Sequence, residues 1–260
     1  MDFLDPEIEG LVKAREMVRL FAVSQGVREE DLSLPSLAIV TFSGRMLEGL
    51  VKVSGGRRLE SWRGRNPRLF LATVGDRTVV LTKSPCGAPS AVILLEELAA
   101  FGVSRTVHVG YCGSIQEEVG LGDIVLPSHA VREDGTSYHY LPGAEKCRPD
   151  QVLLDGLHDW LQQRGMTASV GAIWTTDALY RETVKKVRRY REEGVLAVDM
   201  EMSALFAAGA ILRVGVVGLL LVSDQLSNDA WTPGFFHPRL LEMERVINNI
   251  IMEWVEAGER

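Results

Sequence analysis

Apolar runs of strand length alternate along this chain with longer segments in which apolar residues recur at helical spacing. The runs typical of strands are 37–42, 68–74, 78–83, 105–112, 123–127 and 214–222. The segments with helical periodicity are 6–24, about 90–101, 202–212 and about 239–256. This alternation predicts an α/β fold: one domain with a central mixed, largely parallel sheet flanked by helices. Residues 1–30 are expected to be a helical extension, and residues 31–260 the α/β domain.

Two carboxylates follow apolar strand-like segments in the C-terminal half. Glu201 comes after Ala197-Val198-Asp199, and Asp224 ends the apolar run that starts at Val214. The spacing leaves room for one helix, 202–212, as the return crossover between two parallel strands. Charge at two strand ends predicts a pocket at the carboxyl edge of the sheet.

The composition of the chain limits which kinds of molecule it is expected to bind. The chain has 260 residues, 46% of them hydrophobic, and a net charge of −7 without long acidic runs. This charge disfavours nucleic acid and favours small-molecule ligands. No apolar run reaches membrane-spanning length, the N-terminus lacks the order of a signal peptide, and the three cysteines form no Cys-x-x-Cys pair. We therefore expect a cytoplasmic protein without membrane contact, metal site or cofactor.

Four short segments together resemble one family. These are Val109-Gly110-Tyr111-Cys112-Gly113-Ser114-Ile115, Val119-Gly120-Leu121-Gly122-Asp123-Ile124-Val125, Val198-Asp199-Met200-Glu201-Met202-Ser203-Ala204 and Ser223-Asp224. In this order they resemble the signature of the nucleoside phosphorylase superfamily, which contains bacterial purine nucleoside phosphorylase and uridine phosphorylase. The resemblance spans about residues 36–255, and separated blocks are more specific than any single motif.

The resemblance implies cleavage of a nucleoside's N-glycosidic bond by phosphate, giving a free base and ribose or deoxyribose 1-phosphate. Glu201 would hold the sugar hydroxyls and favour the cationic sugar of the transition state, with Met200 packed against the sugar. Asp224 would protonate the leaving base as general acid. Because a free Asp titrates near ~3.9, this role requires burial to raise its pKa.

Further nucleoside contacts come from the same resemblance. The residues it places around the sugar and base are Asp199, Cys86, Cys112, Gly113, Leu179, Tyr180 and Ser223. Uridine phosphorylases recognise uracil through a Gln and an Arg in the segment that corresponds to 178–183, and no Gln occurs there. Together with Asp224, this absence favours a purine base.

The residues expected to bind the acceptor phosphate depart from the family pattern. The family's Arg before the Val-Gly pair is His108 here, and the small hydroxyl residue after the Gly is Tyr111. A neutral imidazole gains charge only below about pH 6.5, so phosphate affinity is expected to rise as the pH falls. The other predicted phosphate residues are Arg45, Ser43, the Gly87 turn and, from a neighbouring subunit, Arg63. A lent arginine implies a homodimer or a trimer of dimers.

Three functions remain open on this basis. The first is a purine-preferring nucleoside phosphorylase. The second is a nucleosidase of the same superfamily that uses water, because the phosphate arginine is replaced by His108. The third is uridine phosphorylase-like activity or nucleoside binding without catalysis. The base and the sugar are not determined by the sequence.

Overall fold

The computed structural model describes residues 10–143 and 145–258. Its strands are β1 Leu37–Thr41, β2 Arg57–Arg58, β3 Phe70–Val74, β4 Arg77–Lys83, β5 Arg105–Ser114, β6 Ile124–Glu133, β7 Ala168–Thr176, β8 Ala197–Asp199, β9 Gly215–Gln225 and β10 Thr232–Pro233. Its α-helices are α1 Ala14–Val23, α2 Gly44–Ser54, α3 Ala88–Ala100, α4 Gln151–Gln163, α5 Val184–Glu192, α6 Met202–Leu212 and α7 Pro238–Glu256. Short 3-10 turns are η1 Glu29–Leu32, η2 Glu60–Trp62, η3 Thr136–His139 and η4 Leu179–Arg181.

The strands form one mixed sheet in the order β10-β9-β6-β7-β8-β5-β1-β4-β3-β2. Parallel pairing joins β4, β1, β5 and β9, and also joins β6, β7 and β8. Because β5 pairs with both β8 and β9, the strands β5, β9, β6, β7 and β8 close into a ring. The predicted α/β fold with a mixed, largely parallel sheet is confirmed.

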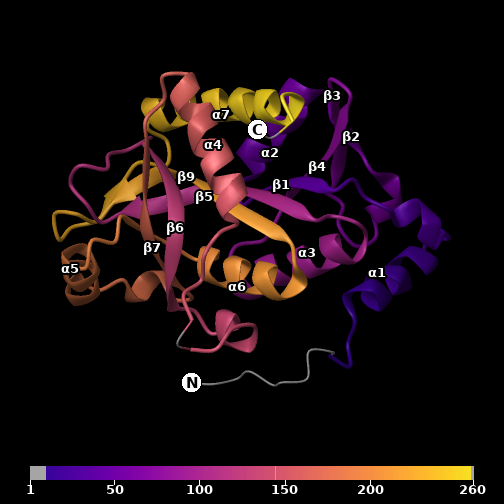
Figure 1. Cartoon of the computed structure of the whole chain (residues 1–260), viewed down its shortest axis with the longest axis horizontal. Helices are drawn as coiled ribbons and strands as arrows, with labels where there is room; N and C mark the ends of the chain where they lie inside the picture. Colours follow the sequence, from indigo (N-terminus) through magenta and orange to yellow (C-terminus); the bar gives the residue numbers. More distant parts are fainter. Residues whose placement is uncertain (1–9, 144, 259–260) are drawn as a thin grey trace.

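Helices cover both faces of this sheet, as Figure 1 shows. Helices α2, α4 and α7 lie on one face, and α3 and α6 lie on the other. The hydrophobic core is divided accordingly into two large clusters, one under each group of helices. Helix α6 is apolar on all sides because it packs against both the sheet and α3. In the described residues no helix is long and apolar enough to cross a membrane.

The N-terminal helix is shorter than predicted. Of the expected helix 6–24, residues 6–9 lie outside the described residues, and α1 begins only at Ala14. Gly10 disfavours helix through the backbone entropy it loses on ordering. Leu11 and Val12 are accordingly exposed instead of packed. From Ala14 onward the prediction is confirmed, since Val18 and Ala22 are buried in a cluster with residues of α3.

The β8-α6-β9 unit is not the parallel crossover that the sequence predicted. Strand β8 pairs antiparallel with β5, whereas β9 pairs parallel with β5 on its other side. The two strands therefore run in opposite directions. The reason is that the strands close into a ring. In this ring α6 connects β8 and β9, which lie on the two sides of β5, whereas in an open sheet it would connect two neighbouring parallel strands.

Candidate active site

Gly113, near the end of β5, is the point where the strands that carry the two catalytic candidates meet. Its register partners are Val198 of β8 and Asp224 of β9. A Cβ at this position would lie 2.8 Å from Leu226 Cδ1, 3.2 Å from Asp224 Oδ2 and 3.3 Å from Val198 Cγ1. Glycine is required because the neighbouring chains approach its backbone this closely. The contact brings Asp224 and the segment leading to Glu201 to one edge of the ring.

Glu201 is held at the start of α6 with its carboxylate buried, and the residue is only 6% exposed. Its Oε1 accepts a hydrogen bond of 2.6 Å from the Gly87 amide. Gly87 has φ 101°, a left-handed conformation that favours glycine, and this turn directs the amide toward the carboxylate. Burial raises the pKa of Glu201. The Gly87 amide, which was predicted to bind phosphate, thus donates its hydrogen bond to Glu201 instead.

Asp199 orders the chain between β8 and α6. Its Oδ2 accepts the amide hydrogens of Glu201 at 2.9 Å and Met202 at 2.7 Å, and its Oδ1 accepts the Thr175 hydroxyl. Burial raises the pKa of Asp199, and the nearby charge of Glu201 adds to this effect. Because three donors satisfy the buried carboxylate, we interpret Asp199 as a residue that positions the backbone of Glu201.

Two sulfur side chains lie next to Glu201. The Cys86 thiol is 3.7 Å from the Met200 sulfur, across two loops that are far apart in the sequence. Burial and the charge of Glu201 raise the pKa of Cys86 to about 11, so that this thiol is protonated at neutral pH. Cys86 and Met200, both predicted to contact the nucleoside, therefore provide neutral surface beside the carboxylate.

Asp224 is 9% exposed and accepts a hydrogen bond at each oxygen. The Ser223 hydroxyl donates to Oδ1 at 2.7 Å, and the Trp231 indole N–H donates to Oδ2 at 2.9 Å. The Ser223 Oγ also lies 3.3 Å from the Cys112 carbonyl oxygen. Trp231 was absent from the sequence-based prediction because it lies in a loop without recognisable spacing.

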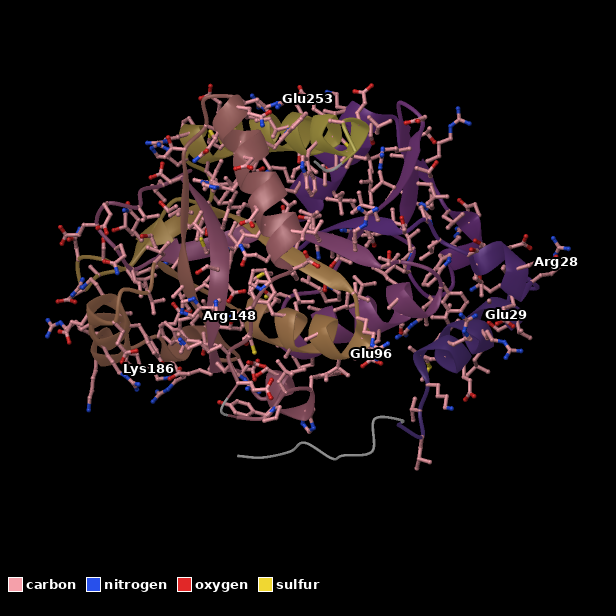
Figure 2. The ribbon with its side chains drawn as sticks, viewed as in Figure 1. Arg28, Glu29, Glu96, Arg148, Lys186 and Glu253 are labelled. Atoms are coloured by element: carbon pink, nitrogen blue, oxygen red, sulfur yellow. The ribbon has the colours of Figure 1, made fainter. Side chains whose placement is uncertain are left out.

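A second carboxyl group, that of Glu182, is influenced by the charge of Asp224. Burial and the charge of Asp224 raise the pKa of Glu182 to about 7, against the opposing effect of Lys186. Lys186 projects from α5 (Figure 2) and donates to Glu133 Oε2 at 2.7 Å. Glu182 was not predicted from the sequence, because nothing in its local pattern indicates that it follows η4 and comes under the charge of Asp224. Near neutral pH the Glu182 carboxyl group therefore still binds a proton in part of the molecules.

Three of the predicted phosphate residues meet around a carboxylate that was not predicted. Arg45 binds both oxygens of Glu244, with its Nε 2.6 Å from Oε2. The Tyr111 hydroxyl donates to Glu244 Oε1 at 2.7 Å and lies 3.3 Å from both Ser43 Oγ and Arg45 Nη2. The Glu244 side chain is 4% exposed. This pairing raises the pKa of Arg45 and balances its charge before any ligand enters.

The signal for Glu244 was present in the sequence of α7. The buried positions Leu240, Ile247 and Ile251 define one face of this helix, and Glu244 falls on the same face. A carboxylate on a core-facing position requires a cation or several donors. The identity of that cation was not predictable, because α2 and Arg45 reach α7 only through the tertiary fold.

His108 does not have the charge that the sequence analysis expected. The residue is 1% exposed and stacks on Phe42, with ring centroids 6.0 Å apart. Its Nε2 lies 3.1 Å from Thr106 Oγ1, and its Nδ1 has no partner among the described residues. Burial lowers its pKa to about 3. The expected gain of positive charge below pH 6.5 is therefore wrong, because the ring has no access to solvent or to a carboxylate.

This burial predicts a measurable effect on stability. Unfolded His108 binds a proton below about pH 6.5, whereas the folded residue does so only near pH 3, so the free energy of unfolding falls as the pH decreases between these values. The slope from this residue approaches about 1.4 kcal/mol per pH unit. His108→Leu should remove this contribution to the pH dependence. In urea unfolding between pH 7 and pH 4, the free energy of unfolding of the variant should therefore fall less steeply with decreasing pH than that of the wild type. Parallel curves for the two proteins would contradict the burial of a neutral ring.

The remaining predicted residues are Cys112, Leu179, Tyr180 and Arg63. Cys112 is buried in the core under α6, and burial raises its pKa. Leu179 and Tyr180 are exposed on η4, Tyr180 almost fully. The Arg63 side chain is also exposed and lies 3.7 Å from Glu60, within its own turn.

Comparison with known proteins shows the family of this chain. The model of the phosphorylase superfamily matches residues 36–250. A DeoD-type purine nucleoside phosphorylase of Alkaliphilus metalliredigens (strain QYMF) is 34% identical over 159 residues, which cover 60% of this chain and 68% of that protein. A DeoD-type enzyme of Bacillus cereus is 31% identical over the same shares of the two chains.

Solved structures show the same fold. Purine nucleoside phosphorylase from Toxoplasma gondii, in complex with immucillin-H, has a TM-score of 0.79 at 20% identity and covers 88% of this chain and 94% of that one. Uridine phosphorylase from Vibrio fischeri ES114 has a TM-score of 0.75 at 23% identity and covers 86% of this chain and 92% of that one. With the family model matching most of its length, this chain belongs to the phosphorylase superfamily, as its sequence motifs predicted.

Proposed function

We propose that this chain is a nucleoside phosphorylase that prefers purine nucleosides and gives a free base and a pentose 1-phosphate. The observation that carries the proposal is that Asp224 of β9 and the β8 segment leading to Glu201 flank Gly113 from two sides, with both carboxylates buried. The purine nucleoside phosphorylases among its relatives support the class of reaction. An acid at position 224 supports a purine, whose ring nitrogen accepts a proton as the base leaves.

In this reaction a phosphate oxygen forms a bond to the anomeric carbon while the bond from that carbon to the base nitrogen breaks. The bonding electron pair leaves with the base, and a proton delivered through Asp224 neutralises it. Glu201 holds the sugar hydroxyls and opposes the positive charge that develops on the ring. Glu182, whose pKa is raised to about 7 by burial and by the charge of Asp224, is the carboxylic acid that we propose as the source of this proton.

One observation favours hydrolysis as a second candidate function. Arg45 is already bound by Glu244, and His108 is neutral, so these two positions offer an anionic acceptor no net charge. A neutral acceptor such as water would not require that charge. The choice between phosphate and water thus depends on whether other cations of this chain reach the acceptor.

The function is tested by incubating purine and pyrimidine nucleosides with the full chain, with and without phosphate, and identifying the sugar product. We expect purine nucleosides to give pentose 1-phosphate, and only when phosphate is present. Free pentose formed at the same rate without phosphate would establish hydrolysis instead. Release of uracil in preference to every purine would contradict the assignment of Asp224.

Assembly and location are proposed on the same basis. We expect a homodimer or a trimer of dimers, since the Arg63 side chain is exposed at the surface, where a neighbouring subunit can meet it. We also propose a cytoplasmic location, as the sequence predicts. Sedimentation of the purified chain measures the first of these expectations.

A further inference from the structure

A pocket of about 490 Å³ lies between the end of β4 and one side of α3, and charged side chains form part of its wall. Three cations line it, Arg65, Arg68 and Lys83, together with one carboxylate, Glu97. None of these residues was selected from the sequence.

The charges in this wall do not balance. Arg65 donates to Glu97 Oε1 through its Nε at 2.8 Å, and this pair is internally neutral. Arg68 and Lys83 form no ion pair with any carboxylate of the described residues, and the Lys83 ammonium donates only to the Ser84 carbonyl oxygen at 3.3 Å. Two uncompensated cations in one concave wall attract an anion, and a dianion most strongly.

The pocket adjoins the proposed site. A Cβ on Gly44, at the start of α2, would lie 3.4 Å from Arg68 Nη1, so this guanidinium lies beside the turn that carries Ser43 and Arg45. Lys83 is paired in register with Thr41 at the end of β1. Pro85, also in the wall, is one residue from Cys86, which contacts Met200. The unpaired cations and the sugar-side carboxylate therefore lie around the same two loops.

We infer that this pocket binds a phosphate group and that Arg68 and Lys83 are its ligands, supplying the charge that Glu244 withdraws from Arg45. A guanidinium offers a two-point contact to phosphate oxygens, and an ammonium adds a point charge. The inference rests on the proposed function where the group is inorganic phosphate as acceptor. The same chemistry would bind the phosphate of a nucleoside 5′-monophosphate, which is the other source.

The test measures binding of inorganic phosphate to the full chain by equilibrium dialysis. Arg68→Met and Lys83→Met should each weaken phosphate binding about 10-fold or more, the loss expected for one charge-assisted contact. Arg58→Met is the matched control, because Arg58 is exposed on β2 and lies over the Phe70 ring, and it should leave the affinity unchanged. Unchanged phosphate affinity in the Arg68→Met/Lys83→Met double variant would overturn the inference, as would an equal loss in the control.

A second measurement separates this inference from the proposed function. Displacement of bound phosphate by a nucleoside 5′-monophosphate is compared with its displacement by further inorganic phosphate. The wild type and Arg68→Met are also assayed for formation of pentose 1-phosphate. Phosphate binding that depends on Arg68, without phosphorolysis, supports the site and refutes the proposed reaction. Tighter binding of the monophosphate, lost in Arg68→Met, supports the site with the substrate as the source of the phosphate group.

Discussion

Replacing Asp224 by asparagine is expected to lower kcat for purine nucleosides by about 10²- to 10⁴-fold, the usual contribution of a positioned acid. Asparagine keeps the size of the side chain and can still accept the Trp231 indole hydrogen bond. It cannot pass a proton to the leaving base, so the base must leave as an anion. Steady-state kinetics at saturating phosphate measures the effect.

A nucleoside whose base needs no proton to leave is the control that tests whether Asp224 acts as an acid. A 7-methylpurine nucleoside already carries positive charge on its ring and needs no proton to depart. Asp224→Asn should therefore cleave it at nearly the wild-type rate. Asp229→Asn is the matched variant in the following loop, where the carboxylate forms an exposed ion pair with Arg188, and it should retain kcat for both substrates. An equal loss on both nucleosides would show that Asp224 positions the base without protonating it.

The parts of the fold predicted from sequence are those that local patterns specify. Helix α6 has its predicted limits because a short apolar crossover leaves little freedom between two strands. The β3–β4 hairpin was equally predictable, since Gly75 adopts the left-handed conformation that its tight turn requires. Glu201 and Asp224 could be selected as candidates because charge at the end of an apolar strand is itself a local signal, and both carboxylates are buried in the fold.

The parts not predicted depend on contacts between distant segments. The opposite directions of β8 and β9 follow from ring closure, which no local pattern records. The charge of His108 depends on Phe42 and on burial, and that of Arg45 depends on Glu244 of the last helix. Residue identity suggested phosphate ligands at both positions. Only the fold reveals that one side chain is neutral and that the other is already paired.

Replacing Glu201 by glutamine is expected to lower kcat by about 10²- to 10³-fold, the size of effect of one preorganised electrostatic contact. Glutamine can still accept the Gly87 hydrogen bond, but it removes the negative charge that opposes the cationic sugar. Because burial raises the pKa of Glu201, the wild-type rate should increase with pH as this carboxyl ionises. The variant should lose that acidic limb of the pH–rate profile.

Stability separates this role from a structural one. The folded chain holds the Glu201 proton more tightly than the unfolded chain does, so this residue's contribution to the free energy of unfolding decreases as the pH rises above the ordinary value of 4.5. A neutral glutamine avoids the cost of burying charge, and the variant should be at least as stable as the wild type at pH 7. Glu253→Gln should show the opposite pattern, since it weakens the 3.0 Å ion pair with Arg164, which none of the described residues of the proposed site contacts: slightly lower stability with kcat retained. A Glu201→Gln protein that loses stability and activity together would instead assign this carboxylate to the scaffold of α6.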